Sequence, residues 1–424
     1  MSLPPAPVRR AVVVGAGHQG LVAALLLARA GVEVTVVEAN DEPGGCIWTE
    51  HLPSGHRLER GALEHGGVMD LAQGLGLDRH GLTFTTRDTI VGTVLGARSL
   101  TFPVDVGAAE AALGADGPAY RAFVGVADAL FTLIDRFPAP PTLAELGGVL
   151  ARMTGGDELF RLLMSSSEVV LAERFADPDV ASAIAMYGGL AQMPPWLQGT
   201  GMFSLLLPSS HAHAAGRPIG GSVALVAALV AALEAAGGRL VTGRAITAIE
   251  PRGRGALVRA GADLALEADV VVSTVDVVRT VALLTAPPIG LARTAARMGS
   301  GRLNVGELKV DVALDRVPDL GPVAAAPDAI WLLQRDRMSF HRSTADVVAG
   351  HLPEDLPVML GLPSASDPTA APAGGAVAWV SAFVPLAPRG GWTVALEEEA
   401  AARMVATVAA TTGIALDAGA VVTR

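Results

Sequence analysis

Three glycines near the N-terminus have the spacing of a phosphate-binding turn. Gly15, Gly17 and Gly20 follow four apolar residues, 11–14, and precede an apolar stretch that runs to Ala30. In such a turn the first glycine lets the chain reverse, the second lets backbone approach a pyrophosphate, and the third lets helix pack on strand. Phosphates bind the free N–H groups and the positive dipole end of the helix. This spacing predicts dinucleotide binding.

The elements around the turn have the order that such a site requires. We expect a buried strand over 11–14, a helix over 18–30 that ends with Gly31 as a left-handed cap, and a second strand over 32–37. Glu38, 18 residues beyond Gly20, is then placed to accept hydrogen bonds from a ribose diol. The alternative, a ligand-free glycine-rich turn in a chain with 49 Gly, is disfavoured by this context. The residues predicted to contact the cofactor here are Gly15, Ala16, Gly17, His18, Gln19, Gly20, Glu38 and Ala39.

A second glycine pair follows the ribose acid. Gly44 and Gly45 offer another close approach of backbone to ligand, followed directly by Cys46. In a plain nicotinamide-binding fold we expect the next helix to begin here. The pair therefore favours a longer cofactor that is contacted along its length.

These motifs resemble a known family. The segment VVVGAGHQGLVAALLLARAGVEVTVVEANDEPGG is similar to the N-terminus of the FAD-dependent phytoene desaturase and amine oxidase-like superfamily. Its GAGHQGLVAA portion is most similar to the phytoene-dehydrogenase-related oxidoreductases that include the pyridine nucleotide-disulfide oxidoreductase domain 2 proteins. The resemblance implies FAD, with the first glycines and Glu38 on its ADP half and the glycine pair along the pyrophosphate and ribityl chain. It also implies that Gly61, within GHRLERGALEHGG, passes the flavin ring.

The cofactor pattern returns at Arg217. RPIGGSVALVAALVAALEAAGGRLVTGRAITAIE resembles the family's second block, which implies that Ile246 lends its backbone to the adenine. Residues 245–250, 256–260 and 263–267 alternate as a small β-meander, and DVVVST, which ends at Thr274, reads as a buried parallel strand near the cofactor. The fold class is therefore α/β, a Rossmann-like FAD-binding domain of glutathione reductase type with a mixed α+β substrate domain. We expect FAD-binding parts at 1–70 and 217–285 and substrate-domain parts at 71–216 and 286–424.

The substrate-domain parts have their own patterns. Short alternating pieces within 82–102 predict strands, and 107–190 reads mainly as helices with breaks at 138–141, 155–156 and 177–178. Further on, 307–314 and 377–384 alternate as strands and 397–411 reads as a helix.

Composition narrows the functional classes. The formal net charge of −11 opposes nucleic-acid binding, and the single cysteine excludes an internal disulfide and a cysteine-cluster zinc site. The longest apolar run, 223–233, is too short to span a membrane, and no signal peptide is evident. We expect a cytoplasmic protein without metal, and leave open a peripheral membrane contact.

Several residues near the cofactor have two interpretations. Cys46 could form a flavin thioether or a redox pair, although a small buried space-filling residue is the preferred interpretation. Trp48 and Glu50 could line the flavin cavity, or Trp48 could be core. The cluster of Glu59, Arg60, Glu64 and His65 could supply an acid or base, or could form a solvated loop face. For His211 and His213, a polar or substrate contact is preferred to metal binding because no third ligand is apparent. No catalytic residue is assigned.

The predicted function is an FAD-dependent desaturase, dehydrogenase or oxidase that moves hydride from a C–H bond of an apolar molecule to flavin N5. A weakly polar insert carrying Met186, Met193, Trp196, Met202 and Phe203 suits such a substrate, although a core has the same composition. Nothing after Thr411 resembles the family's last glycine-rich flavin-binding block. The alternative is therefore a non-catalytic or half-site subunit whose partner chain supplies that block. A nicotinamide enzyme that uses only the first motif is a weaker third hypothesis.

Overall fold

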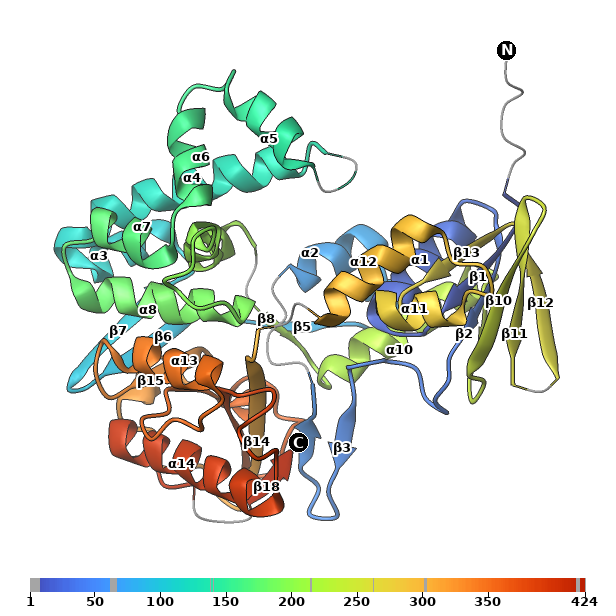
Figure 1. Ribbon diagram of the computed structural model, residues 1–424. Helices are drawn as coiled ribbons and strands as arrows, with labels where there is room; N and C mark the ends of the chain where they lie inside the picture. The colour runs from blue at the N-terminus through green and yellow to red at the C-terminus, as the bar shows by residue number, and fades with distance from the viewer. Residues whose placement is uncertain are drawn as a thin grey trace.

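Two bodies built on separate sheets lie side by side. The computed structural model describes residues 8–61, 67–137, 139, 141–213, 216–261, 263–300, 303–416 and 420–423. In Figure 1 a parallel sheet with a β-meander occupies the right side, and a larger mixed sheet with most of the helices occupies the left. The predicted fold class, a Rossmann-like α/β domain with a mixed α+β domain, is confirmed. The residue ranges of the two domains stay a prediction.

The smaller body is a four-stranded parallel sheet in the order β13-β1-β2-β9. Its strands are β1 (Arg10–Val14), β2 (Glu33–Val37), β9 (Arg239–Val241) and β13 (Val270–Ser273). Because successive side chains of a strand point to opposite faces and both faces of β1 are covered, its buried part, 11–14, needs apolar residues at every position. Ala11 and Val13 pack with helices α1 (His18–Arg29) and α10 (Ser222–Ala235), whereas Val12 packs on the meander.

The meander and the end of the first helix follow the predictions. Strands β10 (Ile246–Arg252), β11 (Gly255–Ala260) and β12 (Leu264–Ala268) form the antiparallel three-stranded sheet. Helix α1 is followed by Gly31 at a φ of +82°, the left-handed conformation that glycine favours.

The larger body is a seven-stranded sheet in the order β18-β14-β17-β16-β15-β6-β7. Neighbouring strands are antiparallel except β6 and β15, which are parallel. Residues 89–103 therefore complete a sheet that is otherwise formed after residue 305. The strands are β6 (Thr89–Leu95), β7 (Arg98–Pro103), β14 (Gly306–Leu314), β15 (Ile330–Gln334), β16 (Val358–Gly361), β17 (Ala376–Val384) and β18 (Ala420–Thr423).

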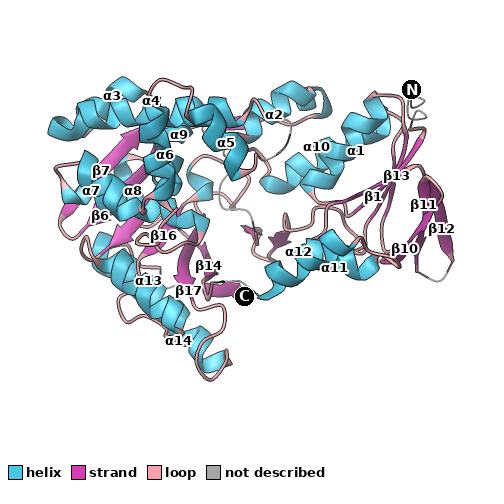
Figure 2. Cartoon of the chain, turned by 45° about the horizontal axis from the view of Figure 1, so that its top comes forward, coloured by secondary structure: helices cyan, strands magenta, loops and turns pink. Residues whose placement is uncertain are grey.

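Helices cover both faces of the larger sheet. On one face Leu308, Val310 and Val312 of β14 pack in a core that includes α14 (Val394–Thr412). On the other face, Trp379 and Phe383 of β17 join a core formed with the helical segment. The ribbon of this segment lies next to the larger sheet in Figures 1 and 2. The helices of that segment are α3 (Val106–Ala112), α4 (Gly117–Ile134), α5 (Leu143–Leu150), α6 (Gly156–Met164), α7 (Ser167–Arg174), α8 (Pro178–Gly188) and α9 (Leu206–Ser209). Two of the three predicted breaks coincide with helix starts, since Asp177 caps α8 and Gly155 precedes α6. The third, 138–141, lies partly outside the described residues.

Shorter elements connect the two bodies. β5 pairs with β8. The chain that leaves the first predicted FAD-binding part, 1–70, therefore lies beside the chain that enters the second, 217–285. The remaining elements are β3 (Thr49–His51), β4 (Arg57–Glu59), α2 (Val68–Leu75), β5 (Phe84–Thr86), β8 (Gly216–Pro218), α11 (Val277–Leu283), α12 (Ile289–Ser300) and α13 (Ser339–Ala349). None of the helices within the described residues combines the length and apolar character that crossing a membrane demands.

Candidate functional site

The glycine-rich turn lies at the carboxyl end of the parallel sheet and is fastened to both neighbouring strands. Gly15 N donates to Val37 O at 2.9 Å, and Thr274 Oγ1 donates to Val14 O at 3.0 Å. A Cβ on Gly20 would lie 2.1 Å from Gly15 O, so no side chain fits there. The close helix–strand packing predicted for Gly20 is present.

The two glycine segments lie against each other. Gly44 N donates to Ala16 O at 2.9 Å, and a Cβ on Gly45 would lie 3.1 Å from Gly17 Cα. Helix α1 begins after Gly17 without a side-chain cap and without an acidic residue in its first turn. Its first N–H groups therefore keep the positive partial charge that binds anions.

Glu38 is a buried carboxylate held in a fixed orientation. Only 7% of the residue is exposed. Its Oε2 accepts from Ala16 N at 2.8 Å, and its Oε1 accepts from Asn40 N at 3.0 Å. A carboxylate has about four lone-pair sites, so acceptor capacity remains for the hydroxyls of a sugar.

These groups surround a cleft of about 650 Å³. The predicted residues that line it are Gly15, Gly17, His18, Gln19, Glu38, Ala39, Gly45, Cys46, Ile246 and Thr274. The other four are not among its lining residues but lie next to residues that are. Ala16 is fully buried, Gly20 packs under the turn and Gly44 bridges to Gly17, while a Cβ on Gly61 would lie 2.0 Å from Cys46 O. The structure thus brings the fourteen predicted residues into one neighbourhood.

Helix α11 contributes residues that sequence reasoning missed. Arg279, Ala282 and Leu283 line the cleft together with Val275, Asn40 and Ala245. The Asp276 side chain accepts from Val278 N and Arg279 N, so α11 begins directly after β13 at the same edge of the sheet. An N-cap aspartate directly after a parallel strand was a usable signal for this placement. The prediction that this strand is buried is wrong, because all four residues of β13 are only half-buried.

A buried charged group, here called the junction cluster, joins the two bodies. It consists of Glu59, Arg217, Ser222, Lys309 and Asp311. The Glu59 carboxylate accepts from Ser222 N at 2.9 Å and lies 3.5 Å from Arg217 Nη2. Lys309 Nζ donates to Asp311 Oδ1 at 2.6 Å and also to Glu59 O. Burial lowers the pKa of Lys309, while the neighbouring Asp311 opposes that shift.

Comparison with known proteins decides the family. The family model for flavin containing amine oxidoreductases matches residues 20–335, more than half of the chain. The chain belongs to this family. The family implies a flavin cofactor.

Curated relatives agree with this membership. The chain is 26% identical over 417 residues to mouse pyridine nucleotide-disulfide oxidoreductase domain-containing protein 2, with 86% of this chain and 71% of that protein covered. It is 28% identical to the phytoene dehydrogenase of Streptomyces griseus, with 89% and 73% covered.

Solved structures share the fold. An oxidoreductase from Methanosarcina mazei is 17% identical, has a TM-score of 0.64, and covers 98% of this chain and 86% of its own. Putrescine oxidase bound to putrescine is 17% identical, with a TM-score of 0.60 and 98% and 84% covered. At these identities the similarity shows the fold alone.

The cleft fits the dinucleotide form of a flavin. The free N–H groups at the start of α1 suit a pyrophosphate, and the buried Glu38 carboxylate suits a ribose diol. Ile246, Val275 and Leu283 supply an apolar wall for a planar base. The volume of about 650 Å³ lies in the usual range for sites of this kind.

Two predicted interpretations beside the cleft are wrong. Cys46 is exposed and lines the cleft, so it is not a buried space-filling residue. Trp48 is 54% exposed, so it is not core; the Arg60 guanidinium lies 5.3 Å from its ring centroid. Both side chains are on the loop after the second glycine pair, where burial depends on tertiary contacts.

The predicted acid–base cluster separates into unlike environments. The solvated-loop interpretation is wrong for Glu59, whose side chain is only 11% exposed within the junction cluster. Arg60 pairs with Glu50 at 3.3 Å. Glu64 and His65 lie outside the described residues.

The two neighbouring histidines point to different partners. His211 lies 2.9 Å from Val104 O and 2.9 Å from Tyr120 Oη, and His213 lies 2.9 Å from Asp70 Oδ2. Across the described part of the chain, no group of three or more His, Cys, Asp or Glu could hold a metal ion.

Proposed function

We propose that the chain is an FAD-dependent oxidoreductase that moves hydride from a C–H bond of an apolar small molecule to flavin. The fixed carboxylate of Glu38 carries the proposal for FAD. It lies beside the phosphate-binding turn, at the position of a ribose acceptor. Flavin mononucleotide lacks the adenosine ribose that this group would bind.

Each part of the cleft has a role in holding FAD. Backbone N–H groups at Gly17 and Gln19 bind the pyrophosphate, Glu38 binds the adenosine ribose, and Ile246 contacts the adenine. Gly45, which lines the cleft, would lie along the chain that leads to the ring, and Gly44 would support it from behind through its bridge to Gly17. Bound FAD supplies a hydride acceptor at N5. The protein residues orient it and exclude water.

The proposal of an apolar substrate is supported by the names of two relatives and not by the composition of the weakly polar insert described above. The phytoene dehydrogenase of Streptomyces griseus and a limonene dehydrogenase chain of Castellaniella defragrans are both named for hydrocarbons. The methionines of the insert do not strengthen this argument, because Met186 is 1% exposed and Met202 packs against the core. We infer a hydrophobic C–H donor.

Titration of the purified chain with FAD tests the proposal. We expect FAD to bind and flavin mononucleotide and NAD to bind far more weakly, measured by quenching of flavin fluorescence and by calorimetry. Glu38→Gln removes an ionised acceptor and should raise the Kd for FAD by about tenfold. Glu33→Gln, an exposed change at the start of β2, the strand that Glu38 directly follows, is the matched control. Equal FAD affinity in Glu38→Gln and the control would contradict the assignment of Glu38.

The alternative of a half-site subunit stays a prediction that the same titration addresses. Full FAD occupancy and turnover by this chain alone would exclude it. Flavin binding only after a second chain is added would support it.

A further inference from the structure

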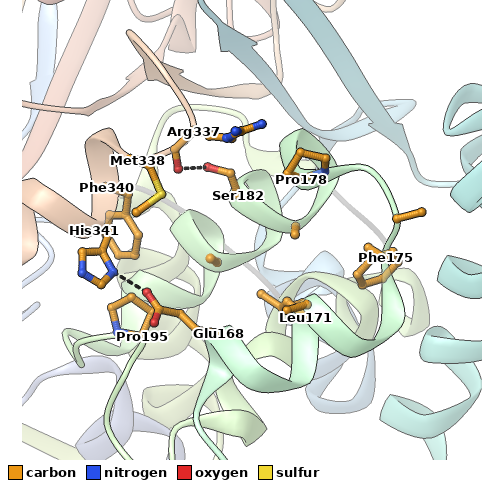
Figure 3. A pocket seen from close by; sticks show the side chains of 14 residues that line it. Glu168, Leu171, Phe175, Pro178, Ser182, Pro195, Arg337, Met338, Phe340 and His341 are labelled. Carbon is orange, nitrogen blue, oxygen red and sulfur yellow. Dashed lines mark hydrogen bonds and ion pairs between the residues drawn. The ribbon is translucent and has the colours of Figure 1, made fainter.

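A second pocket lies in the larger body, away from the cofactor cleft. Its volume is about 470 Å³, and Figure 3 shows its walls. It is lined by helices α7 and α8, the residues between them, Pro195, and the segment that begins α13. None of its lining residues also lines the cofactor cleft.

The middle of the pocket is apolar. Leu171 and Phe175 form one wall, and Met338 and Phe340 form the opposite wall (Figure 3). Several lining positions on α7 and α8 are alanines, so the hollow exists because no large side chain occupies it. A pocket of this kind buries an apolar body, and its few polar groups set the orientation.

At one end of the pocket a carboxylate already has a hydrogen-bond partner. His341 Nδ1 pairs with the Glu168 carboxylate, and the His341 ring lies 4.6 Å from the ring of Trp196. The carboxylate therefore has a partner and is held in place.

The other end carries an unneutralised cation. Figure 3 shows Arg337 at the end opposite the Glu168–His341 pair. Three nearby arginines are paired with aspartates: Arg98 with Asp177 at 2.6 Å, Arg342 with Asp336 at 2.7 Å, and Arg335 with Asp355 at 3.8 Å. Within the described residues Arg337 has no such ion pair. Its planar guanidinium matches the geometry of a carboxylate.

We propose that this pocket binds a compact apolar monocarboxylate, with the carboxylate on Arg337 and the apolar body between Leu171 and Phe340. At roughly 30 Å³ per non-hydrogen atom, the volume holds about 15 such atoms. The site is separate from the flavin cleft and does not rest on the proposed reaction.

Calorimetric titration with three matched probes tests the site: 4-phenylbutyrate, 4-phenylbutan-1-ol and 4-phenylbutylamine. The wild-type chain should bind the carboxylate about fivefold more tightly than the alcohol, and the amine least. Arg337→Gln should remove the preference for the carboxylate while leaving the affinity for the alcohol unchanged. Arg335→Gln, two residues away and outside the pocket lining, is the matched control and should keep the preference.

Ala185→Phe places a ring in the hollow and should abolish binding of all three probes, with thermal melting and FAD binding as checks of the fold. If Ala185→Phe does not fold, Arg337→Gln still tests the proposal, because Arg337 is exposed and its replacement leaves the core unchanged. Tighter binding of the amine, an unchanged preference in Arg337→Gln, or no binding of any probe to the wild type would overturn the proposal. Because the readout is probe binding, its failure is distinct from failure of the flavin assignment.

Discussion

At the scale of single residues, Gly20 shapes the cleft because it has no Cβ atom. The helix can approach the turn only because no Cβ stands between them, and Thr274 Oγ1, directly after β13, closes the same space. Displacing α1 would move the N–H groups of Gly17 and Gln19, which line the cleft. One position therefore controls both packing and cofactor binding.

Gly20→Ala should destabilise the protein by about 2–4 kcal/mol, because a Cβ would lie 2.1 Å from Gly15 O and backbone must shift. FAD binding should fall with it. Gly125→Ala is the matched control, since Gly125 also lies in a helix but has open space around it. The control should be stabilised by about 0.5–1 kcal/mol through helix propensity. Urea unfolding measures both, and equal stability of the two variants would contradict the packing argument.

The sequence predicts residues of the cleft where backbone geometry dictates the residue type. Gly20 and Glu38 belong to a motif whose spacing follows from one strand and one helix. Cys46 and Trp48 lie on a loop, and their exposure depends on contacts that no local pattern encodes. Arg279 was missed for a related reason, because its helix meets the cleft only after the sheet has assembled.

At the scale of helices and strands, hydrophobic periodicity predicts strands whose two faces differ in environment, and capping residues predict where helices begin. β14 alternates between two environments, and its strand was predicted from that alternation. β15 and β16 were not predicted, because both are short apolar runs, and a short apolar run does not distinguish a strand from a buried piece of helix. The parallel pairing of β6 with β15 joins segments that are distant in sequence and has no local signal.

His211 connects elements in the helical body and should make stability depend on pH. A neutral imidazole donates from Nδ1 to Val104 O and accepts the Tyr120 hydroxyl at Nε2. Burial lowers the pKa of His211 below its ordinary value near 6.5. As the pH decreases, His211 is therefore protonated in the unfolded chain before it is protonated in the folded protein. The contribution of neutral His211 to the free energy of unfolding is complete above about pH 6.5 and is lost progressively below it.

Urea unfolding at pH 5.5 and 7.5 measures this effect. His211→Asn should lose less stability between the two values than the wild type, whereas His213→Asn, on an exposed histidine, should behave like the wild type. An identical loss in the wild type and His211→Asn would contradict the argument.

At the scale of the whole molecule, the junction cluster joins segments that are far apart in sequence. Glu59 comes from β4, Arg217 from β8 and Lys309 from β14, so the first domain part, the returning segment and the larger sheet meet at one buried point. Burying these charges is costly unless each is paired. We infer that the cluster makes the relative placement of the two bodies specific.

Lys309→Met tests this inference. It leaves Asp311, which is 1% exposed, without its 2.6 Å partner and should cost about 3–5 kcal/mol of stability. Adding Asp311→Leu removes the buried carboxylate that has lost its Lys309 cation and should restore at least half of the loss. Because Lys309 also donates to Glu59 O, both variants should lose coupling between the bodies. Flavin fluorescence and far-ultraviolet circular dichroism should then give separate unfolding transitions where the wild type gives one. Coincident transitions and a loss below about 1 kcal/mol for Lys309→Met would show that the cluster does not couple the two bodies.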